Sequence, residues 1–188
     1  MAALLPEGTA RLLDLGCGTG LELEPIFARF PALKVTGVDL TAAMLDRLRA
    51  KFPDRDLTLI RGSYVGMDFG RERYDAAVSF ETLHHLEPEE KGALYRRVWE
   101  ALTPEGVYVE CDFMARNDEE EHALRAEHRR LRMEAGAGGD TLYHFDIPCT
   151  LEHQRALLEA AGFVQVTAEP LEGDTVLLTA RKVTPTGA

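Results

Sequence analysis

The chain has 188 residues, of which 45% are hydrophobic and 28% charged, a balance typical of one soluble globular domain with a substantial core. Its 21 Lys and Arg against 32 Asp and Glu give a net charge of −11, which opposes sequence-independent binding to nucleic acid. No apolar run approaches the roughly 20 residues of a membrane span, and the N-terminus lacks a signal-peptide pattern. Three widely spaced cysteines indicate reduced thiols and a cytoplasmic location.

The most informative stretch is Leu12–Gly20, with the sequence LLDLGCGTG. Its apolar start predicts a buried parallel strand, and its three glycines predict a tight turn into a helix over 21–30. Leu21 occupies the third glycine position of the dinucleotide fingerprint, and Asp14 adds a carboxylate that a pyrophosphate would not favour. The pattern therefore favours a ligand with an amino group or a cationic centre.

The motif Asp-Leu-Gly-Cys-Gly-Thr-Gly resembles the first motif of the class I S-adenosylmethionine-dependent methyltransferases. The resemblance covers roughly residues 9–181 and implies one α/β domain over 1–188. In that fold a doubly wound, mostly parallel seven-stranded sheet has an antiparallel last strand, and here a helical insertion follows the fifth strand. It also implies S-adenosyl-L-methionine as cofactor and S-adenosyl-L-homocysteine as product. The family's usual N-terminal helices are nearly missing, so their cover comes from elsewhere in the chain, from a second subunit or from residues outside this sequence.

The rest of the chain alternates between apolar strands and amphipathic helices, as a doubly wound sheet requires. Thr41 and Pro88 mark two helix starts, and 103–106 is predicted to be a turn. Two segments near the end lie close enough in sequence to form a hairpin, which makes the last two strands antiparallel. The predicted strands after the first are 33–40, 57–60, 74–80, 107–113, 163–168 and 175–180.

The insertion, at about 114–149, interrupts this alternation. Asn117 is predicted to cap a helix that ends at Ala135, because its acidic start and basic end suit the helix dipole. A position beyond the fifth strand suits a lid over the active cleft, from which Tyr143 and His144 would reach the ligand. A structural arm or a contact between the subunits of a homodimer is the alternative.

The expected cofactor site lies beyond the carboxyl ends of the strands, where ligands bind in open α/β sheets. Asp39 ends the second strand, and the resemblance implies that it accepts hydrogen bonds from both ribose hydroxyls; a helix cap is the structural alternative. Relatives often have an acidic residue against the adenine, where this chain has Ser63 and Tyr64. The residues expected to contact the cofactor are Asp14, Gly16, Cys17, Gly18, Gly20, Asp39, Leu40, Met44, Gly62, Ser63, Tyr64, Ser79, Phe80 and Glu81.

The implied reaction is in-line transfer of the sulfonium methyl group to a small-molecule acceptor, which needs mainly proximity, alignment and a dry cleft. His84 and His85 are the expected catalytic residues if the acceptor arrives protonated, with packing or capping as the alternative. No metal site is expected, because the two neighbouring histidine side chains should diverge. Two other functions stay open. One is an enzyme of this fold that uses or makes a modified S-adenosylmethionine, and the other is a non-catalytic cofactor-binding or regulatory protein.

Overall fold

The computed structural model describes residues 1–136 and 145–183, so Tyr143 and His144 lie outside the described part. The strands are β1 (Arg11–Leu15), β2 (Lys34–Asp39), β3 (Asp56–Arg61), β4 (Tyr74–Phe80), β5 (Leu102–Phe113), β6 (Val164–Pro170) and β7 (Thr175–Arg181). The helices are α1 (Leu23–Arg29), α2 (Ala42–Lys51), α3 (Pro88–Ala101), α4 (Asp118–Glu134) and α5 (Leu151–Ala160), with short 3-10 helices η1 (Ala2–Leu4) and η2 (Leu83–His85).

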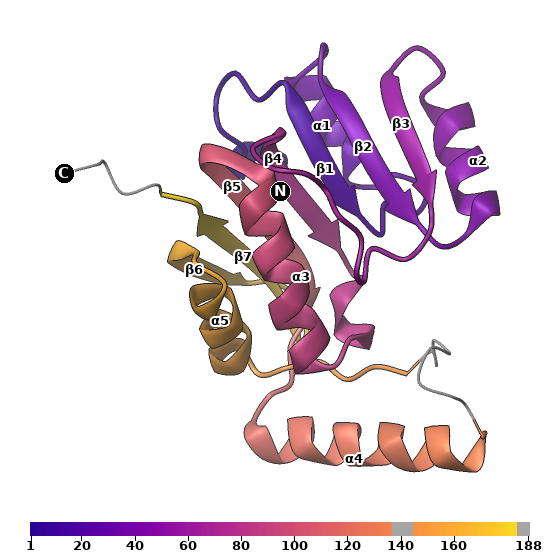
Figure 1. The fold of residues 1–188 in the computed structure, drawn as a ribbon, viewed down its shortest axis with the longest axis vertical. Helices are drawn as coiled ribbons and strands as arrows, with labels where there is room; N and C mark the ends of the chain where they lie inside the picture. The colour runs from indigo at the N-terminus through magenta and orange to yellow at the C-terminus, as the bar shows by residue number, and fades with distance from the viewer. Residues whose placement is uncertain (137–144, 184–188) are drawn as a thin grey trace.

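The seven strands form one sheet in the order β3-β2-β1-β4-β5-β7-β6 (Figure 1). Strands β1 to β5 pair in parallel, whereas β7 pairs antiparallel with both β5 and β6. The predicted fold class is therefore confirmed, including the antiparallel strand beside the fifth. Parallel neighbours bring the carboxyl ends of β1, β2 and β4 to one edge, which positions the predicted site.

The sheet is covered on both faces, so the core consists of two apolar clusters. Successive side chains of β1 point to opposite faces. Leu12 packs in the cluster that contains α1 and α2 residues, and Leu13 packs in the cluster that contains α3 and α5 residues. This two-sided burial explains why β1 and β4 are almost continuously apolar. Within the described residues, no helix is long and apolar enough to cross a membrane.

The sequence prediction differs from the structure around 103–106, which was expected to be a turn and instead lies within β5. Leu102 pairs with Tyr74 and Val107 pairs with Ala76, so the ladder continues on both sides of the irregularity. Glu105 has a left-handed φ of 63°, as a tight turn requires. The turn chemistry was identified correctly, and the surrounding strand pairing incorporates it as a bulge.

The helix of the insertion, α4, crosses below the start of α3 (Figure 1). Its predicted N-cap is confirmed, since the Asn117 side chain accepts the Glu120 N–H. Arg125 binds Glu87, at the start of α3, with Nε and Oε2 3.0 Å apart. Glu121 accepts the backbone N–H of Thr150 at 2.7 Å, which ties the insertion to the start of α5.

Candidate active site

The glycine turn after β1 is built by left-handed backbone angles and by close packing. Gly16, Gly18 and Gly20 all have positive φ values. The N–H groups of Gly16 and Cys17 donate to the Val38 carbonyl, at 2.8 and 3.1 Å, which fixes the turn against β2. A Cβ atom on Gly16 would lie 2.2 Å from Oγ1 of Thr82. Only glycine fits there, because a side chain would meet both backbone strain and Thr82.

Asp39 lies beside this turn, as the sequence predicts. One of its carboxylate oxygens accepts the Gly18 N–H at 2.9 Å, and the other accepts the Thr41 N–H at 2.7 Å. These bonds fix the carboxylate, and each oxygen keeps a further lone pair for an outside donor. A pair of ribose hydroxyls is a suitable donor pair for that arrangement.

Two neighbouring acidic side chains, Asp14 and Glu22, lie behind the turn and are buried. Asp14 is fully buried, and no N–H or hydroxyl group of the described residues donates to either of its oxygens. Oε1 of Glu22 also has no such donor among these residues. Burial, followed by the charge of Glu22, raises the pKa of Asp14 well above its ordinary value. Burial also raises the pKa of Glu22. The two side chains hydrogen-bond each other, and no N–H group of the described residues donates to Asp14, so the pair would suit an ammonium group.

A cavity of about 340 Å³ opens beside the turn. Six of the predicted site residues line it: Gly16, Asp39, Leu40, Ser63, Tyr64 and His85. Four further residues complete its wall: Thr41, Val65, Thr82 and Leu86. Tyr64 is held in place because its hydroxyl lies 2.9 Å from Oγ1 of Thr82 and donates to the Thr82 carbonyl at 3.0 Å. Burial raises the pKa of Tyr64 to about 12, so this hydroxyl stays protonated at neutral pH.

The remaining predicted cofactor residues lie around the cavity and not in its wall. The Gly62 N–H donates to the Asp39 carbonyl at 2.9 Å, which joins the two strand ends. Cys17 is buried against Gly37, where an added Cβ would lie 2.8 Å from its sulfur. Gly18 and Gly20 belong to the turn, and Met44 lies on α2 with 37% of its surface exposed.

The predicted residues at the end of β4 point in different directions. The Ser79 hydroxyl is fully buried and lies 2.7 Å from the Tyr108 hydroxyl, in the core. Phe80 is half-buried at the strand end. Glu81 is exposed with a φ of 48°, and its N–H donates to the Cys111 carbonyl. Their contact with a cofactor stays a prediction.

His84 is buried and is oriented by Asp112, at the end of β5. Nδ1 of His84 lies 2.5 Å from Oδ1 of Asp112. Oδ2 of Asp112 accepts the Leu83 N–H at 2.7 Å, and Oδ1 also accepts the Phe113 N–H at 2.9 Å. Burial alone would raise the pKa of Asp112, but the hydrogen bond and charge of His84 outweigh it and lower that pKa. The arrangement fixes the ring and leaves Nε2 of His84 facing away from Asp112.

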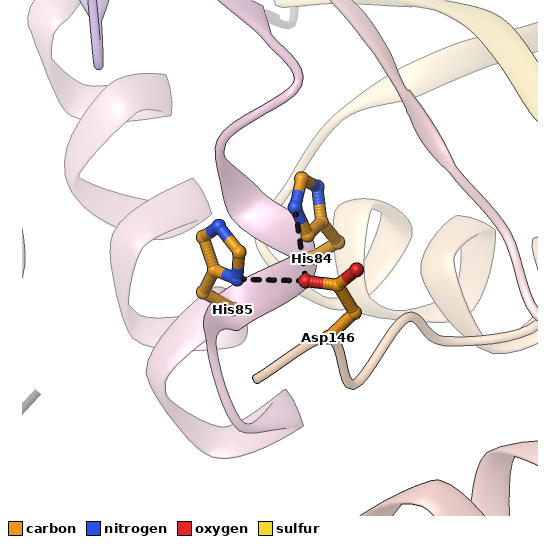
Figure 2. A group of neighbouring side chains, drawn as sticks. All are labelled: His84, His85 and Asp146. Carbon is orange, nitrogen blue, oxygen red and sulfur yellow. Dashed lines mark ion pairs between the residues drawn. The ribbon is translucent and has the colours of Figure 1, made fainter. Parts of the chain in front are cut away.

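The expectation that the two histidine side chains diverge is wrong. Their ring centroids are 4.0 Å apart in an edge-on arrangement. Both rings face Asp146, which lies near the end of the insertion and is 63% exposed at its side chain (Figure 2). Adjacent residues diverge in a regular strand or helix, but both lie in the short η2 segment. Their environment therefore combines two imidazoles and one carboxylate.

Four residues of this region were not selected from the sequence: Glu22, Thr82, Asp112 and Asp146. Asp112 lies near the end of the predicted strand 107–113, at the edge of the sheet where ligands bind. Glu22 follows the glycine turn directly, so its proximity to Asp14 was a readable signal. The contact of Asp146 with η2 had no such signal, because Asp146 and His85 are far apart in the chain and their contact depends on the path of the insertion.

The sheet order, the glycine turn and the acidic end of β2 together define a class I methyltransferase fold. The chain matches the Methyltransferase domain family over residues 12–106 and belongs to that family. The predicted family is therefore confirmed, and with it S-adenosylmethionine as the cofactor of that family.

Similar proteins carry different names for their reactions. Carboxy-S-adenosyl-L-methionine synthase of Chromohalobacter salexigens is 31% identical over 84% of this chain and 63% of its own length. Trans-aconitate 2-methyltransferase of Deinococcus radiodurans is 31% identical over 89% of this chain and 64% of its own length. The chain thus spans less than two thirds of both relatives. An S-adenosylmethionine-dependent methyltransferase structure from Mesorhizobium loti shares the fold, with a TM-score of 0.70 and 24% identity over 96% of this chain and 94% of that one.

Proposed function

We propose that this enzyme transfers the methyl group of S-adenosylmethionine to a small-molecule acceptor that enters beside η2. The observation that carries the proposal is the pair of neighbouring buried carboxyl groups, Asp14 and Glu22, in which no N–H group of the described residues donates to Asp14 or to Oε1 of Glu22. The methionine part of the cofactor ends in an ammonium group, and Asp39 nearby can accept from the ribose hydroxyls. These features match the two ends of the same ligand, whereas a phosphate-rich cofactor would meet unfavourable charge.

The residues present fit the cofactor in three respects. Gly16 lines the cavity, Asp14 with Glu22 would hold the ammonium group, and Asp39 would hold the ribose. Bound S-adenosylmethionine supplies an activated methyl group, so the protein has to align the acceptor and exclude water. The apolar wall formed by Leu40, Val65 and Leu86 suits the adenine side of such a site.

His84 is the proposed catalytic residue for an acceptor that arrives protonated. Asp112 fixes the tautomer with the proton on Nδ1, so Nε2 has the free lone pair that a general base needs. His85 lines the cavity and lies against the His84 ring, and we propose that it contacts the acceptor. His84 does not line the cavity, so its imidazole should contribute little to cofactor affinity, and its effects on turnover and on cofactor binding can be measured separately.

The alternative is that the enzyme makes a modified cofactor, as the name of the Chromohalobacter relative indicates for that protein. A carboxylated S-adenosylmethionine would need a cationic side chain near the sulfonium carbon. Among the described residues that line the cavity there is no Lys or Arg, and we therefore favour methyl transfer. Mass spectrometry of the ligand that co-purifies with the protein separates the two reactions, because a carboxylated product is heavier than S-adenosylhomocysteine.

The first experiment is calorimetric titration of the full chain with S-adenosylmethionine and S-adenosylhomocysteine, with NAD as control. We expect binding of the first two alone, and binding of NAD alone would overturn the proposal. Transfer of a labelled methyl group is then measured across a panel of small carboxylic acids, phenols, thiols and amines. We expect His84→Ala to lower turnover much more than cofactor affinity; an equal loss of both would make His84 a structural residue.

A further inference from the structure

We propose that His84, His85 and Asp146 bind a divalent metal ion of the zinc type at the wall of the cofactor cavity. The role of the ion in methyl transfer rests on the proposed function. The binding of the ion does not, because it can be measured without any methyl acceptor. Two imidazole nitrogens and one carboxylate oxygen are a ligand set typical of catalytic zinc sites, which keep a further position open.

The spacing of the three ligand atoms already suits a small cation (Figure 2). Nε2 of His84 lies 3.6 Å from Oδ1 of Asp146, and Nδ1 of His85 lies 3.3 Å from the same oxygen. All three atoms lie within 4.8 Å of one another. Zinc bonds of about 2.0–2.2 Å at tetrahedral angles would place such atoms about 3.4 Å apart. An ion would therefore enter with only small movements of the side chains.

His84 has the partner that a metal-binding histidine usually has on its other nitrogen. Asp112 holds Nδ1 at 2.5 Å, so the proton stays on Nδ1 and the lone pair of Nε2 is directed toward Asp146. Asp112 is in turn fixed by the backbone N–H of Leu83. This chain of a carboxylate, a histidine and a metal position is the common way in which proteins orient a ligand and strengthen it.

The backbone keeps the third ligand at this place. Ile147 directly follows Asp146, and its N–H donates to the His84 carbonyl at 2.7 Å. Nδ1 of His85 also lies 3.4 Å from the Phe145 carbonyl, a long contact that metal binding would replace. Asp146 is 63% exposed and His85 lines the cavity, so water or an acceptor can occupy the remaining positions of the ion.

A second group of metal-binding residue types, Glu121, Cys149 and His153, is a poorer site. Both carboxylate oxygens of Glu121 are engaged, by the Thr150 N–H at 2.7 Å and by Nδ1 of His153 at 2.6 Å. The ammonium group of Lys91 donates to the Cys149 sulfur at 3.7 Å. A cation already beside the sulfur opposes a second one, so this group serves as the internal comparison for the proposed site.

With the ion bound, the acceptor would be activated by the metal and His84 would act as a ligand. The oxygen or sulfur of the acceptor coordinates the ion, which lowers the pKa of its proton, and the proton passes to solvent. The lone pair of that atom then forms the bond to the methyl carbon, while the electron pair of the carbon–sulfur bond stays on the sulfur. The products are the methylated acceptor and neutral S-adenosylhomocysteine. The proposal thus narrows the acceptor to a molecule with an ionisable oxygen or sulfur, and the role of His84 as a base belongs to the metal-free protein.

The test is a titration of the chelator-treated full chain with Co²⁺, whose visible absorption reports its coordination and whose near-ultraviolet absorption reports a thiolate ligand. We compare the unchanged protein with Asp146→Asn and His85→Gln. His153→Gln is the matched control, because it makes the same change in the other group. Asp146 is exposed, so its variant should fold even if His85→Gln does not.

We expect one equivalent of Co²⁺ to bind without a thiolate band. Asp146→Asn and His85→Gln should each weaken binding by about tenfold or more, and His153→Gln should leave it unchanged. No binding to the unchanged protein, or a thiolate band that His153→Gln abolishes, would overturn the assignment. Calorimetry of Asp146→Asn with S-adenosylmethionine keeps this result separate from the proposed function, because Asp146 does not line the cofactor cavity and its substitution should leave cofactor binding intact.

Discussion

Asp14 and Asp112 are both buried at the same edge of the sheet, yet their surroundings are opposite. Asp14 has no N–H or hydroxyl donor among the described residues, and burial raises its pKa. Asp112 accepts from backbone N–H groups and from the His84 ring, and its pKa is lowered. The comparison separates two kinds of buried carboxylate. Asp112 has its hydrogen-bond donors within the protein and orients another side chain, whereas Asp14 is suited to a cationic group of a ligand.

The largest expected effect belongs to Asp112→Ala. The substitution leaves the N–H groups of Leu83, His84 and Phe113 without their acceptor and removes the partner of a buried ring. We expect the free energy of unfolding in urea to fall by about 3–5 kcal/mol. Asp56→Ala is the control, since Asp56 is 60% exposed and 3.8 Å from Lys34, and should cost less than about 1 kcal/mol. Equal losses in both variants would remove the positioning role of Asp112.

Asp39→Ala should have the next largest effect, and it acts on binding. Two charge-assisted hydrogen bonds to the ribose are lost, each about 1.5–3 kcal/mol, so affinity for S-adenosylmethionine should fall roughly a hundredfold or more. Calorimetric titration measures the change. Because Asp39 also accepts the Gly18 and Thr41 N–H groups, a urea unfolding curve of the variant is the control. Unchanged affinity would exclude Asp39 from the site.

Glu110 is an intermediate case, buried but supplied with donors. Tyr95 and Tyr108 donate to one of its oxygens and Gln154 to the other, and the charges of Lys91 and Asp112 also act on it. Burial raises its pKa from 4.5 to about 7. The folded state therefore holds this proton more tightly than the unfolded state does. Its contribution to stability is complete below pH 4.5 and is lost as the pH rises through about 7.

The size of this effect is at most about 3 kcal/mol between pH 4.5 and 8, in the direction of lower stability at higher pH. Urea unfolding at several pH values measures the slope, and Glu110→Gln should flatten it. Asp14 contributes a slope of the same sign, so some dependence should remain in that variant. A slope that is the same with and without Glu110 would contradict the assignment.

Asp14→Asn should give the smallest change in stability, and with the opposite sign from Asp112→Ala. Burial and the charge of Glu22 make an ionised Asp14 unfavourable in the folded state, so an uncharged Asn should stabilise the ligand-free protein by about 1–2 kcal/mol near pH 8. The same variant should bind S-adenosylmethionine at least tenfold more weakly, because the ammonium group loses a partner. Thermal unfolding with and without cofactor measures both. A variant that is less stable and binds normally would make Asp14 a structural residue.

The two halves of the site also differ in how far the sequence predicts them. The cofactor half depends on a single continuous turn and on Asp39 at the end of the next strand, whose backbone pairing brings them together. Apolar runs and glycine spacing are local signals, and the sheet order followed from them and from the family resemblance. The acceptor half joins η2, Asp112 and Asp146, and their contact depends on packing between segments far apart in the chain.

The irregular stretches explain the remaining differences. Adjacent histidines were expected to diverge because a regular strand or helix separates neighbouring side chains, and η2 is too short for that rule. The turn at 103–106 was absorbed into β5, since pairing with β4 outweighs local turn chemistry. In both places the local sequence is compatible with more than one conformation, and tertiary contacts determine which one forms.

The insertion leaves and re-enters the domain at almost one point, because Ala115 forms a parallel bridge with Thr150 and its N–H donates to the Cys149 carbonyl at 2.9 Å. Because its two ends meet, we expect the intervening stretch to be a cassette that can vary in length without displacing β5 or the start of α5. Asp146 lies inside this cassette, whereas Asp14, Asp39 and Asp112 lie outside it. Exchange of the cassette between relatives would thus be a route by which one scaffold acquires new acceptors while it keeps the same methyl donor.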